Sequence, residues 1–134
     1  LGAEVLAKGL VPILEPEVTI SIADKAEAEA MLLDEILKYL DMLPEGERVM
    51  LKLSLPSKAG LYAPLIAHPK VMRVVALSGG YTRDEACALL AQNPGMIASF
   101  SRALTEGLSA DQPDAAFNSA IGDAIEAIYR ASVT

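Results

Sequence analysis

The chain has little of several residue types, and each shortage excludes some classes of structure or function. It holds a single cysteine, Cys87, among 134 residues, so no disulfide can form within the chain. Lysine and arginine number 11 against 18 aspartates and glutamates, which gives a formal net charge of −7. Nucleic acids and anionic membranes reward clustered basic residues, so we expect neither as a partner.

Long apolar runs are missing too. No run approaches the roughly 18 residues that a membrane crossing needs, and the N-terminus lacks the basic region and cleavage site of a secretory signal. With the lone cysteine, this composition predicts a cytoplasmic protein. Leu1 stands where an initiator methionine would be, so we expect a piece of a longer chain. Metal-ligand clusters, a Ser-His-Asp pattern and a phosphate-binding P-loop are also absent from the sequence, which predicts no metal.

What the chain does have is an alternation of strands and helices. Hydrophobic residues make up 52% of it and charged residues 22%, as in a globular domain. Apolar runs of strand character lie at 10–18, 49–56, 71–77 and 96–101. Helices are predicted after them at 26–43, 62–67, 82–91 and 115–131. Sequential strands joined by helices imply a parallel α/β sheet that is buried on both faces.

Two architectures fit this alternation. A doubly wound sheet of four or five strands would be a complete small domain, whereas four βα units are half of an eight-stranded barrel of ~250 residues. The spacing of the units allows either.

Lys52 is the residue around which a site is predicted. Strand periodicity turns Val49, Leu51, Leu53 and Leu55 to one face of their strand and Lys52 to the other. If the second face is interior, burial favours the uncharged amine, which is a nucleophile for carbonyl carbon. The alternative is a solvated lysine on an edge strand, where it guards against aggregation.

Residues with chemical function gather at or near the carboxyl ends of all four predicted strands. They are Glu15, Glu17, Lys52, Ser78, Gly79, Gly80, Ser101 and Arg102. Ligands bind at this edge of parallel α/β folds, so one common site is predicted. A glutamate beside the amine could supply the proton that carbinolamine dehydration needs, although a solvated strand end has the same composition. The Ser-Gly-Gly turn exposes backbone N–H groups and the arginine adds a fork-shaped donor, a pair that suits a phosphate.

At these positions the sequence resembles class I fructose-bisphosphate aldolase of the bacterial branch. The matching motifs are Gly9–Glu17, Leu51-Lys52, Leu77–Gly80, Phe100–Leu104 and the ending at 128–134. The resemblance implies that residues 1–134 are the C-terminal half, strands five to eight, of a single (β/α)8 barrel domain whose N-terminal half is absent.

The resemblance also implies a reaction. Class I aldolases reversibly cleave fructose 1,6-bisphosphate to dihydroxyacetone phosphate and glyceraldehyde 3-phosphate in glycolysis and gluconeogenesis, through a Schiff base and without a metal or other cofactor. By this match Lys52 forms the imine, Glu15 is the acid/base and Glu17 supports it. The phosphate of dihydroxyacetone phosphate is held by Ser78, Gly79 and Arg102, with Gly80 and Ser101 adjacent.

The chain departs from vertebrate members of the family. They have Ser-Tyr-Gly where this chain has Ser99-Phe100-Ser101, Lys-Pro-Asn where it has Lys52-Leu53-Ser54, and a functional terminal tyrosine where it has Thr134. The family's functional residues on the first strands are absent. We therefore expect the chain to be inactive alone, with its open sheet edges covered by a missing N-terminal half or by self-association.

Two other functions remain open at this point. One is another imine-forming sugar-phosphate aldolase of barrel fold, such as a transaldolase or deoxyribose-phosphate aldolase. The other is a non-catalytic α/β module that binds a phosphorylated ligand through the Ser-Gly-Gly turn and Arg102.

Overall fold

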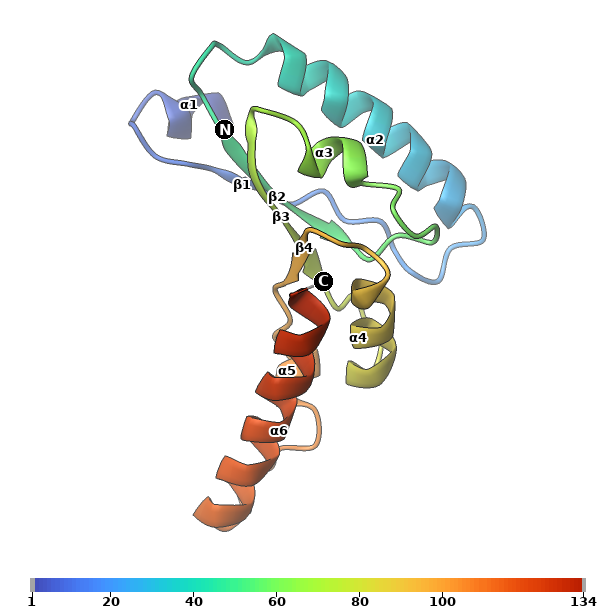
Figure 1. Ribbon diagram of the computed structural model, residues 1–134, viewed down its shortest axis with the longest axis vertical. Coiled ribbons are helices and arrows are strands. Elements are labelled where there is room, and N and C mark those ends of the chain that lie inside the picture. Colours follow the sequence, from blue (N-terminus) through green and yellow to red (C-terminus); the bar gives the residue numbers. More distant parts are fainter. Residues whose placement is uncertain (1, 134) are drawn as a thin grey trace.

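A computed structural model describes residues 2–133 as one parallel sheet with helices packed against it (Figure 1). The strands are β1 (Ile13–Leu14), β2 (Val49–Ser54), β3 (Val71–Leu77) and β4 (Met96–Ala98). The helices are α1 (Gly2–Leu6), α2 (Lys25–Met42), α3 (Ala63–Ile66), α4 (Arg83–Ala91), α5 (Arg102–Thr105) and α6 (Asp114–Ser132). The predicted α/β class with four βα units is confirmed. Among the described residues, no helix is both long and apolar enough to cross a membrane.

The strands lie side by side in the order in which they occur in the chain. β1 pairs with β2, β2 with β3 and β3 with β4, and all three pairs are parallel. A doubly wound sheet reverses its strand order at a switch point, and no reversal occurs within residues 2–133. The sequential order therefore favours the half-barrel over the doubly wound alternative.

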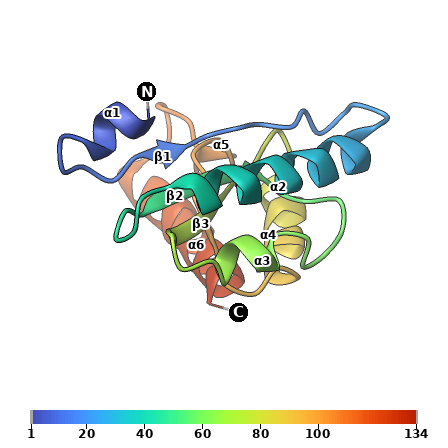
Figure 2. The same cartoon turned by 90° about the horizontal axis from the view of Figure 1, so that it is seen from above.

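Most of the core lies between the sheet and the helices that cover one side of it. One valine and three leucines alternate along and just after β2 and are at most 1% exposed, namely Val49, Leu51, Leu53 and Leu55. They belong to one buried cluster with Leu40 of α2 and Leu65 of α3. In Figure 1, α2 and α3 lie on the same side of β2 and β3, and α6 extends away at the other end of the molecule. Figure 2, turned by 90°, again shows α2 and α3 beside each other. The predicted alternation of β2 is confirmed.

The best-predicted elements have strong local signals at their ends. β3 spans the predicted 71–77, and the predicted capping box opens α4. Thr82 accepts a hydrogen bond from the backbone N–H of Glu85, and the Glu85 carboxylate accepts one from the N–H of Thr82. This carboxylate–donor arrangement lowers the pKa of Glu85. Two unpaired donors of the first helical turn are thereby satisfied.

β1 is much shorter than the apolar run 10–18 indicates. Only Ile13 and Leu14 pair with β2, opposite Met50 and Leu51. Pro12 and Pro16 flank the pair, and neither can donate to a ladder because proline has no backbone N–H. The chain beyond Leu14 therefore follows β2 without regular strand pairing.

Candidate active site at the carboxyl edge of the sheet

A cavity of about 670 Å³ opens at the carboxyl ends of the strands. Every residue of the predicted site lines it except Gly80. Strands β2, β3 and β4 each contribute lining residues. The stretch just after β1 contributes Glu15 and Glu17. The expectation of a single shared rim thus agrees with where the chain brings these side chains together.

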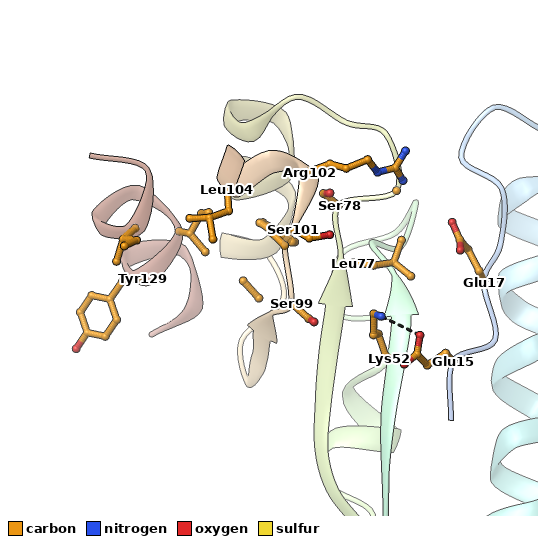
Figure 3. A pocket seen from close by; sticks show the side chains of 15 residues that line it. Glu15, Glu17, Lys52, Leu77, Ser78, Ser99, Ser101, Arg102, Leu104 and Tyr129 are labelled. Atoms are coloured by element: carbon orange, nitrogen blue, oxygen red, sulfur yellow. Dashed lines mark hydrogen bonds and ion pairs between the residues drawn. The ribbon is translucent and has the colours of Figure 1, made fainter. Parts of the chain in front are cut away.

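Lys52 and Glu15 form an ion pair inside this cavity (Figure 3). Lys52 Nζ lies 2.8 Å from Glu15 Oε2, and the two residues are 37 positions apart in the sequence. The lysine side chain is 27% exposed and the glutamate side chain 51%. Lys52 is therefore half-buried rather than enclosed, because its face of β2 opens into the cavity. A proton can pass directly between the amine and the carboxylate at this distance.

Glu17 lies on the same segment and lines the same cavity, above the pair in Figure 3. It is exposed, and Figure 3 draws no interaction between it and Lys52. Glu15 is thus the carboxylate that the structure pairs with the amine, and Glu17 adds a second negative charge nearby.

The turn after β3 contributes Ser78 and Gly79 to the lining of the cavity. Ser78 is buried at 4% exposure, and its carbonyl accepts a hydrogen bond of 3.0 Å from the N–H of Tyr81. Gly79 has a φ of 64°, and a Cβ added there would lie 3.0 Å from Ile20 Cγ2. Only glycine combines that conformation with that approach. Gly80 belongs to the same turn but does not line the cavity.

Arg102 enters the cavity from the next strand connection. It is the first residue of α5, whose N-cap is Ser101, and its exposed side chain lies on the same side of the cavity as Ser78 (Figure 3). A guanidinium beside a serine hydroxyl and a glycine turn can hold a phosphate or another tetrahedral anion.

Arg83 joins the segment after β3, which carries Ser78 and Gly79, to the segment after β4, which carries Arg102. The capping-box pattern in the sequence did not indicate this role. Its Nε donates to the carbonyl of Ala103 at 2.8 Å, and its Nη2 donates to the carbonyl of Glu106. Its backbone N–H in turn donates to the Glu106 carboxylate at 2.7 Å. The start of α4 is thereby fixed to α5, directly beside Arg102.

Two further contributions were not predicted. The apolar wall of the cavity comes from β4 and the following helices, through Ala98, Leu104, Ile125, Ile128 and Tyr129. Amphipathic helix periodicity marks Ile125 and Ile128 as apolar but cannot say which cavity they line. Ser54, two residues beyond Lys52, fastens the Glu17–Val18 segment to β2. Within residues 2–133 no group of three or more His, Cys, Asp or Glu side chains is arranged to hold a metal ion.

The fold and site together define an α/β protein that presents an amine–carboxylate pair, a glycine turn and an arginine at the carboxyl edge of parallel strands. The chain is 56% identical over all 134 of its residues to fructose-bisphosphate aldolase class 1 of Synechocystis sp., strain PCC 6803. It spans 45% of the length of that relative. No family model matches the chain. The resemblance read from the motifs is confirmed, and the chain corresponds to a C-terminal portion of a class I fructose-bisphosphate aldolase.

Proposed function

We propose that this chain supplies the imine-forming lysine and one phosphate site of a class I aldolase that reversibly cleaves fructose 1,6-bisphosphate to dihydroxyacetone phosphate and glyceraldehyde 3-phosphate. One observation carries the proposal. Lys52 Nζ is 2.8 Å from Glu15 Oε2 in a cavity that Ser78, Gly79 and Arg102 also line. The reaction belongs to glycolysis and gluconeogenesis, which predicts a cytoplasmic enzyme.

The ion pair suits both halves of imine formation. Glu15 first accepts a proton from the Lys52 ammonium, which frees the amine to attack the ketone carbon. As the amine adds, its nitrogen passes a proton to the former carbonyl oxygen, which becomes the carbinolamine hydroxyl. The protonated Glu15 then gives its proton to this hydroxyl, which leaves as water. The product is an iminium on Lys52 beside a carboxylate, so charge and protons balance. The iminium then accepts the electron pair of the breaking C3–C4 bond, and no metal or other cofactor takes part.

The phosphate next to the ketone is held at the other side of the cavity. The Ser78 hydroxyl, the N–H groups of the glycine turn and the Arg102 guanidinium are the donors available there. Ser101 is the residue before the helix that begins at Arg102, and it lines the same cavity. Binding the phosphate at a fixed distance from Lys52 brings the carbonyl carbon to the amine. Holding the two reacting groups together in this way accelerates the reaction.

The four βα units are, in this proposal, strands five to eight of a (β/α)8 barrel, and residues 1–134 are part of one domain. The open edges support this reading. Leu10 is 62% exposed and Ile13 48% at the β1 edge, while Ile125 and Tyr129 of α6 are 54% and 61% exposed. A barrel closed by an N-terminal half would cover both apolar edges. That half would also supply the residues that cleave C3–C4 and bind the second phosphate, so the chain alone is inactive.

The test uses a protein that we name the full-barrel chimera, in which the part of the Synechocystis sequence that precedes the match is followed by residues 1–134. Borohydride reduction in the presence of dihydroxyacetone phosphate is expected to leave a covalent adduct on Lys52, located by peptide mass spectrometry. Lys52→Met is expected to abolish the adduct and lower kcat by at least 10³-fold. The matched control is Lys58→Met, which removes an exposed lysine six residues away and should change neither.

An adduct on another lysine would overturn the mechanism. No adduct, combined with retained binding of inorganic phosphate, would instead support a non-catalytic phosphate-binding module. Turnover of substrates with one phosphate in preference to two would point to a different imine-forming aldolase.

A further inference from the structure

We propose that Ser54 is a positioning residue that holds Glu15 against Lys52. It lies on β2 two residues after Lys52 and is 1% exposed. Its hydroxyl makes two hydrogen bonds to one residue of the neighbouring segment. The hydroxyl accepts from the N–H of Val18 at 3.0 Å and donates to the carbonyl of Val18 at 2.8 Å.

These bonds act where the backbone pairing of the sheet has ended. The register between β1 and β2 covers Ile13 and Leu14 only. Pro16 follows and has no N–H to donate, so a regular ladder cannot continue through the acidic segment. The Ser54 hydroxyl takes the place of ladder bonds and fixes Val18 to β2, just beyond Glu17.

The position of Glu15 relative to Lys52 depends on this hydroxyl. Lys52 and Ser54 lie on the same face of β2, because side chains two apart on a strand point the same way. Glu15 lies between the short pairing at Leu14 and the anchor at Val18. With both ends held, Glu15 Oε2 stays 2.8 Å from Lys52 Nζ. Without the Val18 anchor, only the Leu14 end of the segment is held by the sheet.

The phosphate donors do not share this dependence. Ser78 and Gly79 follow β3, and Arg102 follows β4, whereas Ser54 ties β2 to the segment after β1. Loss of the hydroxyl should therefore slow imine formation and leave phosphate binding in place. This separation of kcat from KM distinguishes a positioning role from a general loss of structure.

The experiment rests on the proposed function and uses the full-barrel chimera. Ser54→Ala is expected to lower kcat by about 10- to 100-fold, because a displacement on the order of 1 Å in a reacting group has effects of that size. KM and inhibition by inorganic phosphate should change less than about threefold. Ser54→Thr, which keeps the hydroxyl, should recover at least part of the lost kcat. Ser54→Cys keeps the side-chain size with a weak hydrogen-bonding group, and should resemble the alanine variant.

Ser132→Ala is the matched control. The Ser132 hydroxyl also accepts from a backbone N–H, that of Ala98 at 3.0 Å, and donates to a carbonyl, that of Ile128 at 2.9 Å. It joins α6 to β4 and touches neither Lys52 nor the acidic segment. A comparable loss of thermal stability without a comparable loss of kcat is expected for this variant.

The outcomes separate the two proposals. A wild-type chimera that borohydride traps on Lys52, with Ser54→Ala and Ser54→Cys turning over like Ser132→Ala, would overturn the role of Ser54 and leave the proposed function standing. A wild-type chimera that is not trapped would overturn both. Loss of kcat in the Ser54 variants with recovery by threonine supports both.

Discussion

Lys25 and Glu29 form an ion pair one turn apart on α2 that is almost completely buried, at 6% and 0% exposure. Neither charge is left without further partners. Lys25 Nζ donates to the carbonyl of Leu55 at 2.9 Å and to Ser57 Oγ at 3.1 Å, and Glu29 Oε2 accepts from the N–H of Ser57 at 2.9 Å. The pair holds α2 against the segment that follows β2, the strand that carries Lys52.

Breaking this pair on one side should be costly. Glu29→Ala leaves the Lys25 ammonium buried and unpaired, so the free energy of unfolding should fall by about 3–5 kcal/mol. The double variant Lys25→Met with Glu29→Leu should lose less than the single one, because no charge then stays buried. Urea unfolding of the full-barrel chimera measures both.

An exposed pair on the same helix provides the comparison. Lys38 Nζ lies 2.5 Å from Glu35 Oε1, with the side chains 66% and 55% exposed. Glu35→Ala should have little effect on stability, since solvent screens such pairs. Equal losses for Glu29→Ala and Glu35→Ala would contradict the structural role assigned to the buried pair.

Replacing Tyr62 should stabilise the folded protein. The residue is 1% exposed, and its hydroxyl has no hydrogen-bond partner among the described residues. A buried polar group without a partner costs about 1–3 kcal/mol. Tyr62→Phe should therefore raise the free energy of unfolding by roughly 1 kcal/mol, measured by urea unfolding at neutral pH. A loss of stability would mean that the hydroxyl is bonded in solution.

The same tyrosine gives a pH dependence with a definite sign. Burial raises its pKa well above the usual 10.0, and the nearby charge of Glu29 adds to the effect. The unfolded chain then releases this proton at a lower pH than the folded chain does. The contribution to stability is complete below about pH 10 and is lost as the pH rises further. Wild type should lose more stability than Tyr62→Phe between pH 9 and 11, and parallel curves would refute the assignment.

Substitution of Arg83 should weaken phosphate binding. Its bonds to Ala103 and Glu106 fix α5, and therefore Arg102, beside the turn at Ser78. Arg83→Ala in the full-barrel chimera should raise the inhibition constant of inorganic phosphate by about 3- to 10-fold, the equivalent of one ordinary hydrogen bond of about 1 kcal/mol. The adduct on Lys52 should still form at saturating dihydroxyacetone phosphate.

Arg130→Ala is the matched control for that change. Arg130 is also an arginine with a local partner, Glu126 at 2.6 Å, but both lie on the exposed face of α6. Phosphate inhibition that responds equally to the two substitutions would show a general charge effect and would contradict the role of Arg83.

The sequence predicted most of what depends on short-range patterns. Alternation along β2, the apolar run of β3 and the capping box at Thr82 are local signals, and all are present in the structure. The grouping of Glu15, Lys52 and Arg102 followed from the rule that parallel strands place their carboxyl ends at one edge. These are statements about neighbours in sequence or about topology.

What was missed depends on three-dimensional partners. Lys25 and Glu29 have the spacing of an ordinary solvated helix pair, and only their place on the same stripe as Leu33, Ile36 and Leu40 signals burial. The length of β1 is limited by its prolines, a signal that was available. The bonds of Ser54 to Val18 and of Arg83 to Ala103 join residues 36 and 20 positions apart, and no local pattern indicates them.

The order of the strands has a consequence for how the substrate is divided. Because β1 to β4 lie side by side in chain order, the amine, its acid and the phosphate donors all fall within residues 15–102 of one continuous stretch. In the proposed reaction this stretch binds the ketose end of the sugar, and the proposed N-terminal half of the barrel would bind the aldehyde end. The bond that breaks then lies on the seam between two halves of one polypeptide, so a cut in the chain between them would separate recognition of the two products.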